Sequence, residues 1–108
     1  MASLIVVSIT SVNVASSANQ ILPRIWVHLY DSDGNPVVKT QVTVYNTDYS
    51  NPVTATTGAN GMALLTYNYG QIIVTASTIS PTCTTWDFEP NMATVPLQVG
   101  TTNCPPQP

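Results

Sequence analysis

Two acidic stretches hold the side chains best suited to binding or catalysis. In the first, Asp31-Ser-Asp33-Gly-Asn35, oxygen-bearing side chains alternate as they do in the first half of a calcium-binding loop. The bidentate glutamate that such a loop needs at its twelfth position is replaced by Val42. Carboxylates in turns of this composition also accept hydrogen bonds from nearby backbone N–H groups. We therefore expect Asp31 and Asp33 to hold a turn together, with calcium as the alternative, and we predict no resident metal or cofactor.

The second acidic stretch consists of Asp87 and Glu89, beside Trp86 and Phe88. A pair of carboxylates can hydrolyse a glycosidic bond when the two groups stand at the right separation. Residues two apart on a strand share a face, but nothing around this pair indicates a cleft. The aromatic neighbours can either bind the face of a sugar or pack into a core, and packing is the favoured interpretation.

The single histidine, His28, lies between Val27 and Leu29. A general base needs a positioned partner, and no cysteine, serine-nucleophile motif or carboxylate pair is close to His28 in the sequence. We interpret it as a surface or interface residue. The sequence therefore predicts no catalytic residue and a protein that is not an enzyme.

Aromatic side chains are the candidate contact residues. A single exposed patch of tyrosines with one tryptophan would suit either a protein contact or stacking against a sugar. A protein contact is favoured, because interfaces are rich in aromatic residues and poor in charge. The candidates are Trp26, Tyr45, Tyr67, Tyr69 and Trp86, with Tyr49 as a further member of the patch.

The two cysteines, Cys83 and Cys104, are predicted to form a disulfide. This bond would tie the Pro-rich tail to the start of a late strand, and a loop of this length is stabilised by about 3 kcal/mol in the chain-entropy model. A disulfide also indicates an extracellular location. The alternative is two unrelated buried thiols; a metal site is disfavoured because no Cys-x-x-Cys spacing exists.

The elements that must position these residues are short β-strands. Segments rich in β-branched and aromatic residues alternate with clusters of Gly, Pro, Asn and Asp, and no segment has the periodicity of a helix. We expect Ile25, Val27 and Leu29 to face the core, Asp31–Pro36 to be the turn of a β-hairpin or a close relative, and Gly58–Gly61 to be the turn of a second hairpin. The predicted strands are Ile21–Tyr30, Gln41–Tyr45, Val53–Thr57, Met62–Tyr67, Gln71–Ser77, Thr82–Asp87 and Ala93–Val99. With a strand at the N-terminus, seven or eight strands predict an all-β sandwich of two antiparallel sheets.

Residues 1–20 are predicted to form a long N-terminal strand, Ser3–Val14, and a flexible joint. The alternative is a signal peptide, which is disfavoured because the stretch has no Lys or Arg and its apolar run is interrupted by polar residues. Such a strand can fold back onto its own domain, the favoured outcome, or pair with a neighbouring subunit. Its apolar residues are Leu4, Ile5, Val6, Val7, Ile9, Val12 and Val14. The sandwich would then comprise residues 21–100, followed by a tail at 101–108.

Charge is scarce in this chain. Charged residues make up 6% of the sequence, with Arg24 and Lys39 as the only cations, whereas soluble domains average about 25%. No basic stripe is possible, so we predict no nucleic-acid binding. The N-terminal stretch is too short and too polar to cross a bilayer, so we predict no membrane insertion. A polar but nearly uncharged surface allows copies of the chain to associate easily.

The two turn motifs at their observed separation resemble those of a group of immunoglobulin-like sandwiches. The pattern is Asp31-Ser-Asp-Gly-Asn-Pro-Val37, a strand, then Thr57-Gly-Ala-Asn-Gly61 before another apolar strand. The group includes transthyretin-like and carboxypeptidase-regulatory-like domains, B-type repeats of collagen adhesins and invasin-type repeats. The resemblance covers roughly Ile25 to Ala76 and implies an immunoglobulin-like fold. The adhesin repeats carry an isopeptide-forming lysine where this chain has Leu29, so the resemblance does not extend to that bond.

These observations favour a non-enzymatic, extracellular structural subunit that assembles with copies of itself. The assembly would be a filament, a pilus-like fibre or a surface layer, located on a cell, an appendage or a virion. Donation of the strand Leu4–Val14 to a neighbour would be its mechanism. The alternative is a monomeric binding module, such as a virion decoration, adhesin or carbohydrate-binding domain, whose partner is a glycan or a surface receptor.

Overall fold

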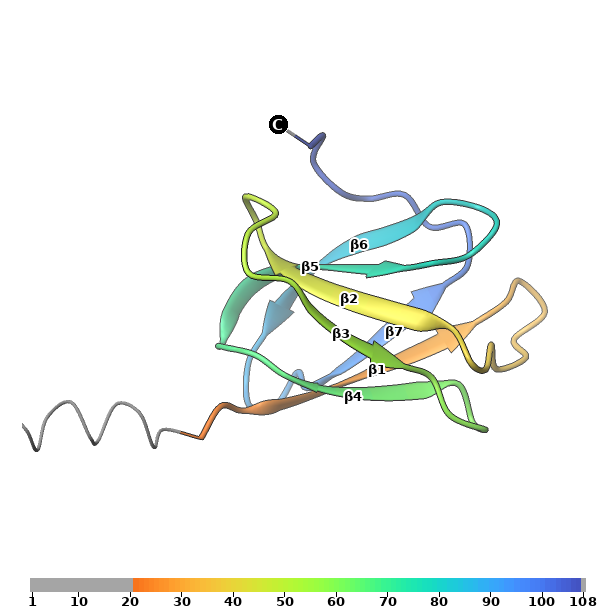
Figure 1. Ribbon diagram of the computed structural model, residues 1–108, viewed down its shortest axis with the longest axis horizontal. Helices are drawn as coiled ribbons and strands as arrows, with labels where there is room; N and C mark the ends of the chain where they lie inside the picture. The colour runs from red at the N-terminus through yellow and green to blue at the C-terminus, as the bar shows by residue number, and fades with distance from the viewer. Residues whose placement is uncertain (1–20, 108) are drawn as a thin grey trace, which may run out of the picture.

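Seven strands arranged in two layers form the domain (Figure 1). The structure, a computed structural model, describes residues 21–107, so the predicted strand Ser3–Val14 lies outside the described residues. No helix occurs within the described part of the chain. The strands are β1 (Arg24–Tyr30), β2 (Gln41–Asn46), β3 (Val53–Thr56), β4 (Met62–Thr66), β5 (Gly70–Ala76), β6 (Thr82–Phe88) and β7 (Thr94–Gln98). Each lies within a few residues of its predicted range.

One layer is a three-stranded sheet in the order β4-β1-β7, and the other a four-stranded sheet in the order β3-β2-β5-β6. Every pair is antiparallel except β1 and β7, which run parallel with Val27 opposite Val95. The prediction of two purely antiparallel sheets is therefore wrong for this pair. A parallel neighbour requires a long connection, and here the whole of β2 to β6 supplies it.

The two predicted hairpin turns are turns, but they do not make hairpins. Asp31–Pro36 links β1 to β2, and Gly58–Gly61 links β3 to β4, and in both cases the two strands belong to different sheets. After the first turn, only an isolated bridge between Tyr30 and Pro36 forms before the chain crosses to the other layer. The composition of the turns specifies a reversal of the chain but not the sheet that the next strand joins. The hairpins of the structure are β2–β3 and β5–β6.

The core lies between the two layers and follows the alternation of the strands. Ile25, Val27 and Leu29 of β1 are fully buried, as predicted. Val42 and Val44 of β2 meet them from the other sheet. Burying each such side chain contributes roughly 1.5–3 kcal/mol. The remaining members of the core are Ala63, Leu65, Tyr67, Ile72, Val74, Phe88, Val95 and Leu97.

A second buried site lies on the opposite face of the four-stranded sheet. Ile73 is completely buried, yet it does not belong to the main core, because its neighbours Ile72 and Val74 face inward and it must face outward. Its cross-strand partners are Tyr45 and Thr85. The polypeptide that covers this face is the C-terminal tail.

The tail is fixed to the outer face at both sides of β5. On β6, the backbone N–H and C=O of Cys83 bond to Thr101 and Asn103, and Cys83 forms the predicted disulfide with Cys104. Beside β2, the Tyr49 hydroxyl donates a hydrogen bond to the carbonyl of Pro105. A segment that joins β6 to the β2 side must cross β5, and Figure 1 shows the tail above this sheet. The disulfide thus holds the tail over Ile73.

Removing the disulfide should free the tail. The double variant Cys83→Ser/Cys104→Ser is expected to lose about 3 kcal/mol of unfolding free energy, because the crosslink no longer restricts the unfolded chain. Chemical denaturation measures the loss, and reduction of the wild-type protein provides the matched control. A loss below about 1 kcal/mol would show that hydrogen bonds and packing hold the tail without the crosslink.

Among the five glycines of the chain, Gly61 is the one at which an added side chain would meet the closest atoms. It has φ +77°, and an added Cβ would lie 2.6 Å from the Leu29 carbonyl oxygen and 2.8 Å from Pro36 Cβ. We expect Gly61→Ala to destabilise the domain by about 3 kcal/mol, from left-handed strain plus backbone overlap. Gly34→Ala is the matched control, because Gly34 has φ +85° but no atom near its added Cβ, so only about 1 kcal/mol should be lost. Equal losses in the two variants would contradict the role of close packing at Gly61.

Candidate functional site

The outer face of the three-stranded sheet carries an apolar strip. Since the odd-numbered residues of β1 point into the core, Trp26, His28 and Tyr30 must point outward. Trp26 is 40% exposed and lies opposite Leu64 of β4, which is 38% exposed. No described element covers this face.

Two further residues extend the strip on either side of β1. His28 lies between Met62 of β4 and Pro96 of β7. Its ring packs against Tyr30 at a centroid distance of 5.5 Å and a tilt of 47°. We name the set Trp26, His28, Tyr30, Met62, Leu64 and Pro96 the outer strip. The sequence predicts a surface position for Trp26 and His28, but no pattern in it indicates Met62, Leu64 or Pro96 as surface contact residues.

The candidate aromatic residues do not form one patch. Tyr67 is buried in the core, and its hydroxyl donates a hydrogen bond of 2.8 Å to the Asn51 carbonyl. Tyr45 packs edge-on against Tyr49 beside the tail, at 5.6 Å between ring centroids. Tyr69 is exposed and packs against Phe88. These tyrosines thus lie at three separate sites, none of which is part of the outer strip; of the candidate aromatic residues, only Trp26 belongs to the strip.

The loop between β2 and β3 is tied down by its own side chains. Asp48 accepts hydrogen bonds from the Ser50 hydroxyl at 2.5 Å and from the Ser50 N–H at 3.1 Å. These bonds hold the pKa of Asp48 below its usual value. Asn46 donates to the Ser50 hydroxyl at 3.0 Å. The loop therefore presents Tyr49 in a defined position against the tail.

The acidic turn is organised by Asp31. One of its carboxylate oxygens accepts hydrogen bonds from the backbone N–H of Asp33 at 3.0 Å and of Asn35 at 2.9 Å. This is the turn-stabilising role expected for the motif. Among residues 21–107, no group of three or more His, Cys, Asp and Glu side chains gathers as metal ligands would.

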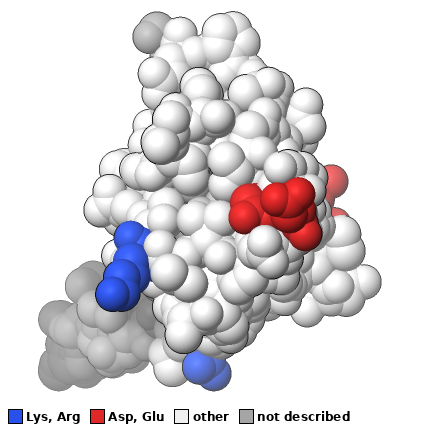
Figure 2. Space-filling model, turned by 90° about the vertical axis from the view of Figure 1, so that its right-hand side faces the viewer, with Lys and Arg blue, Asp and Glu red and all other residues white. Residues whose placement is uncertain are grey.

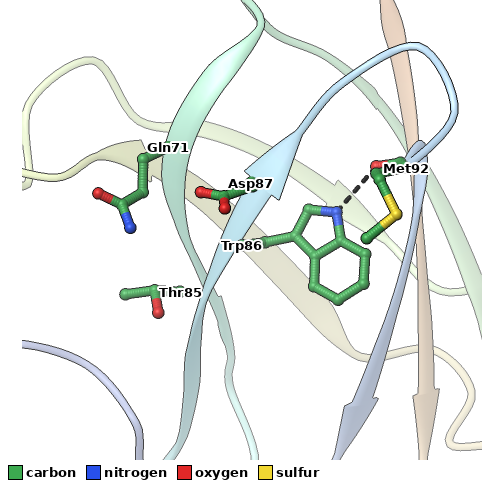
Figure 3. Close-up of a pocket in the computed structure, with 5 residues that line it drawn as sticks. All are labelled: Gln71, Thr85, Trp86, Asp87 and Met92. Atoms are coloured by element: carbon green, nitrogen blue, oxygen red, sulfur yellow. Dashed lines mark hydrogen bonds between the residues drawn. The ribbon is translucent and has the colours of Figure 1, made fainter.

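A shallow hollow of about 280 Å³ lies at β6 and is lined by Gln71, Thr85, Trp86, Asp87 and Met92. The Trp86 indole N–H donates a hydrogen bond of 2.8 Å to the Met92 carbonyl, which fixes the ring. Figure 3 shows the ring on the Met92 side of β6 and Gln71 and Thr85 on the other side. Phe88 is fully buried and belongs to the core, whereas Asp87 and Glu89 are exposed.

Charge is scarce on the surface as well as in the sequence. Figure 2 shows a face that is almost wholly uncharged, with acidic side chains on its right-hand side and basic side chains at its left and lower margins. The outer strip contains no Asp, Glu, Lys or Arg, and Arg24 lies at its end, opposite Thr66. Within residues 21–107, no helix is long and apolar enough to cross a membrane.

No known protein-family model matches the sequence, and no curated protein matches it. The surface must therefore be interpreted from its own residues.

Tyr67 gives the domain a pH dependence in alkaline solution. Burial raises its pKa above the ordinary value of 10.0, so its stabilising contribution is complete below about pH 10 and is lost as pH rises through the raised pKa. We expect Tyr67→Phe to lose about 1 kcal/mol at neutral pH with the hydrogen bond to Asn51. The difference in unfolding free energy between wild type and variant should then shrink above about pH 10. Denaturation curves at several pH values measure this difference, and a difference that stays constant with pH would contradict the role of burial.

Proposed function

We propose that this protein is a non-enzymatic, extracellular structural subunit that assembles with copies of itself into a filament, pilus-like fibre or surface layer. The observation that carries the proposal is the outer strip. Its Trp26–Leu64 pair is uncovered by any described element, and the strip holds no charged side chain. Exposed apolar sheet faces of this kind are typical of interaction sites.

Two properties of the whole chain support association with identical copies. With 6% charged residues and a net charge of −3, electrostatic repulsion between copies is weak. The disulfide between Cys83 and Cys104 supports a location outside the reducing cytosol. The proposed mechanism is donation of the strand Leu4–Val14, whose alternate side chains would enter a neighbouring sandwich while its backbone extends a sheet.

We also propose the finer fold assignment, to the immunoglobulin-like group that includes transthyretin-like domains and B-type adhesin repeats. It is supported by the turns at Asp31–Pro36 and Gly58–Gly61 and by the two-layer arrangement of seven strands. The strand partition differs from that of immunoglobulin constant domains, where the first and second strands share a sheet. Here β1 and β2 lie in opposite layers.

A second candidate function is a monomeric binding module for a glycan or surface receptor. The hollow at β6 favours it, because its lining combines an indole ring, held by a hydrogen bond to the Met92 carbonyl, with the side chains of Gln71 and Asp87. An aromatic ring can stack on a sugar, and amide and carboxylate groups can bond to sugar hydroxyls. The hollow is shallow, and its ring lies on the opposite side of β6 from Gln71 and Thr85, so the self-assembling subunit is our first proposal.

Removal of residues 2–18 tests the first proposal. The truncated chain should be a folded monomer, because it keeps every strand from β1 to β7 but lacks the segment to be donated. Size-exclusion chromatography with light scattering and electron microscopy compare it with the full chain, which should form polymers. The same disulfide and the same circular dichroism in both proteins serve as the folding control.

Two results would overturn the proposal in different ways. A truncated chain that still polymerises rules out strand donation. A full chain that stays monomeric at high concentration, and binds a glycan that Trp26→Ala or Trp86→Ala no longer binds, establishes the second candidate.

A further inference from the structure

The two sheets have four outer edges, and their hydrogen-bonding groups differ. An outer edge strand presents every second backbone N–H and C=O to a possible additional strand. The edge strands are β4 and β7 in one sheet and β3 and β6 in the other. The backbone hydrogen bonds of each edge strand to its inner neighbour identify the residues whose N–H and C=O groups are left pointing away from the sheet.

The edges of β6 and β7 are partly closed. Between β1 and β7, the N–H of Trp26 donates to the carbonyl of Ala93, and the N–H of Val99 donates to the carbonyl of Tyr30. The backbone groups of the odd-numbered residues of β7 therefore point toward β1, and those of Pro96 point away from the sheet. Proline has no N–H to offer there. On β6, both backbone groups of Cys83 are already bonded to the tail. Neither edge offers an uninterrupted row of partners.

The edge of β4 is open from Leu64 onward. The N–H of Leu29 donates to the carbonyl of Gly61, and the N–H of Tyr67 donates to the carbonyl of Pro23. The backbone groups of the odd-numbered residues of β4 therefore point toward β1, while those of Leu64 and Thr66 point away from the sheet. No backbone bond joins Leu64 or Thr66 to another described residue. An added strand would find two donors and two acceptors here.

The edge of β3 is also open, at Thr54 and Thr56, but its surroundings are polar. Thr54 bonds through its hydroxyl to Thr43 on the outer face of that sheet. Beside β4, the corresponding outer face is the outer strip with Leu64 and Trp26, and the inner side is the core with Ala63 and Leu65. A strand added to β4 would thus have the apolar side chains of Met62 and Leu64 beside it on the outer face, with Thr66 as a polar neighbour at the end of β4, and the core on the inner face.

The segment with matching chemistry is the start of this chain. Leu4-Ile5-Val6-Val7 is apolar at successive positions, and successive side chains of a strand point to opposite faces, so this segment requires apolar cover on both sides. At β3 the outer neighbours of an added strand would be polar threonines, so one side of the segment would lack apolar cover. At β4 the outer strip provides apolar side chains on one side and the core provides them on the other.

Length favours a second copy as the donor. The twelve residues Ser3–Val14 would span about 40 Å as a strand, and the five residues of β4 only about 17 Å. The described chain begins at Ile21, which is 91% exposed, and Leu22 borders the ends of β3 and β4 at Val53 and Tyr67. Because Ser3–Val14 is longer than the β4 edge, the residues that do not pair with β4 can span the distance between the donor domain and the acceptor domain.

We propose that the outer edge of β4, at Leu64 and Thr66, accepts the segment Leu4–Val14 of a second copy. This inference rests on the proposed function and adds to it the acceptor edge. Each copy would then carry one donor segment and one acceptor edge, a head-to-tail contact that builds a polymer.

The test replaces the outward N–H of β4 with a proline ring in the full chain. Leu64→Pro removes a donor from the edge but no bond to β1, and Pro96 occupies the equivalent outward position in β7. Thr54→Pro likewise removes an outward N–H, from the open edge of β3, together with the exposed hydroxyl bond to Thr43, and is the control. We expect Leu64→Pro to raise the concentration needed for polymerisation by about tenfold or more, from a lost hydrogen bond and a blocking ring, and Thr54→Pro to leave it unchanged.

Mixing experiments add a readout that loss of stability would not produce. Leu64→Pro keeps its donor segment, so it should bind the acceptor end of a wild-type polymer and stop growth, shortening polymers in electron micrographs. Thr54→Pro should be incorporated without shortening them. Thr66→Pro, at the last residue of β4, is the second variant should Leu64→Pro fail to fold, and the same shortening is expected.

The outcomes separate this inference from the proposed function. Normal polymers from both β4 variants, or a block by Thr54→Pro alone, overturn the β4 edge as acceptor while strand donation stands if removal of residues 2–18 still abolishes polymers. Polymers that persist after that removal overturn both. A full chain that is monomeric at every concentration also overturns both.

Discussion

The period-two alternation of β1 is the constraint on which the rest of the structure depends. β1 is the central strand of its sheet, bonded to β4 on one side and β7 on the other. Three of its side chains are completely buried between the layers, so the register cannot shift by one residue without exposing all of them. The same alternation forces Trp26, His28 and Tyr30 onto the outer face. The outer strip is thus a direct consequence of how the core is filled.

Local features of the fold could be predicted from the sequence because they depend on nearby residues. The strands, their inward faces, the disulfide and the Asp31 turn all follow from alternation, turn composition and cysteine count. The partition of strands between sheets could not be predicted in the same way. The turn at Asp31–Pro36 would suit a hairpin, but the segment after it carries the chain to the other layer, where Lys39 bonds to Thr57 beside β3. The pairing of Val27 with Val95 joins residues from opposite ends of the domain, and no local pattern specifies its direction.

Only part of the outer strip could be predicted from the sequence, because local patterns do not specify which distant strands pair. Four successive apolar residues, Met62 to Leu65, signal that a strand has apolar side chains on both faces, but not which residue lies opposite Trp26. Tyr67 could not be separated from the exposed tyrosines, because its burial depends on a loop sixteen residues away that accepts its hydroxyl. Ile73 is the opposite case, a side chain that is buried where the strand alternation predicts exposure. Its burial depends on the distant C-terminal tail, which bonds to Cys83 and to Tyr49 on the two sides of β5.

Protection of sheet edges links the scarcity of charge to the proposed assembly. Edge strands commonly carry lysine, which discourages pairing with other chains, but Lys39 is the only lysine of this chain and lies outside every strand. β7 is instead protected by Pro96, and β6 by a tail that the disulfide holds in place. No comparable device is present at β4 within the described residues, although its edge adjoins the outer strip. The edge of β3 is open as well, but its outer neighbours are polar threonines. The proposal of β4 as the acceptor therefore depends on the apolar residues beside its edge, which match the apolar segment Leu4–Val7.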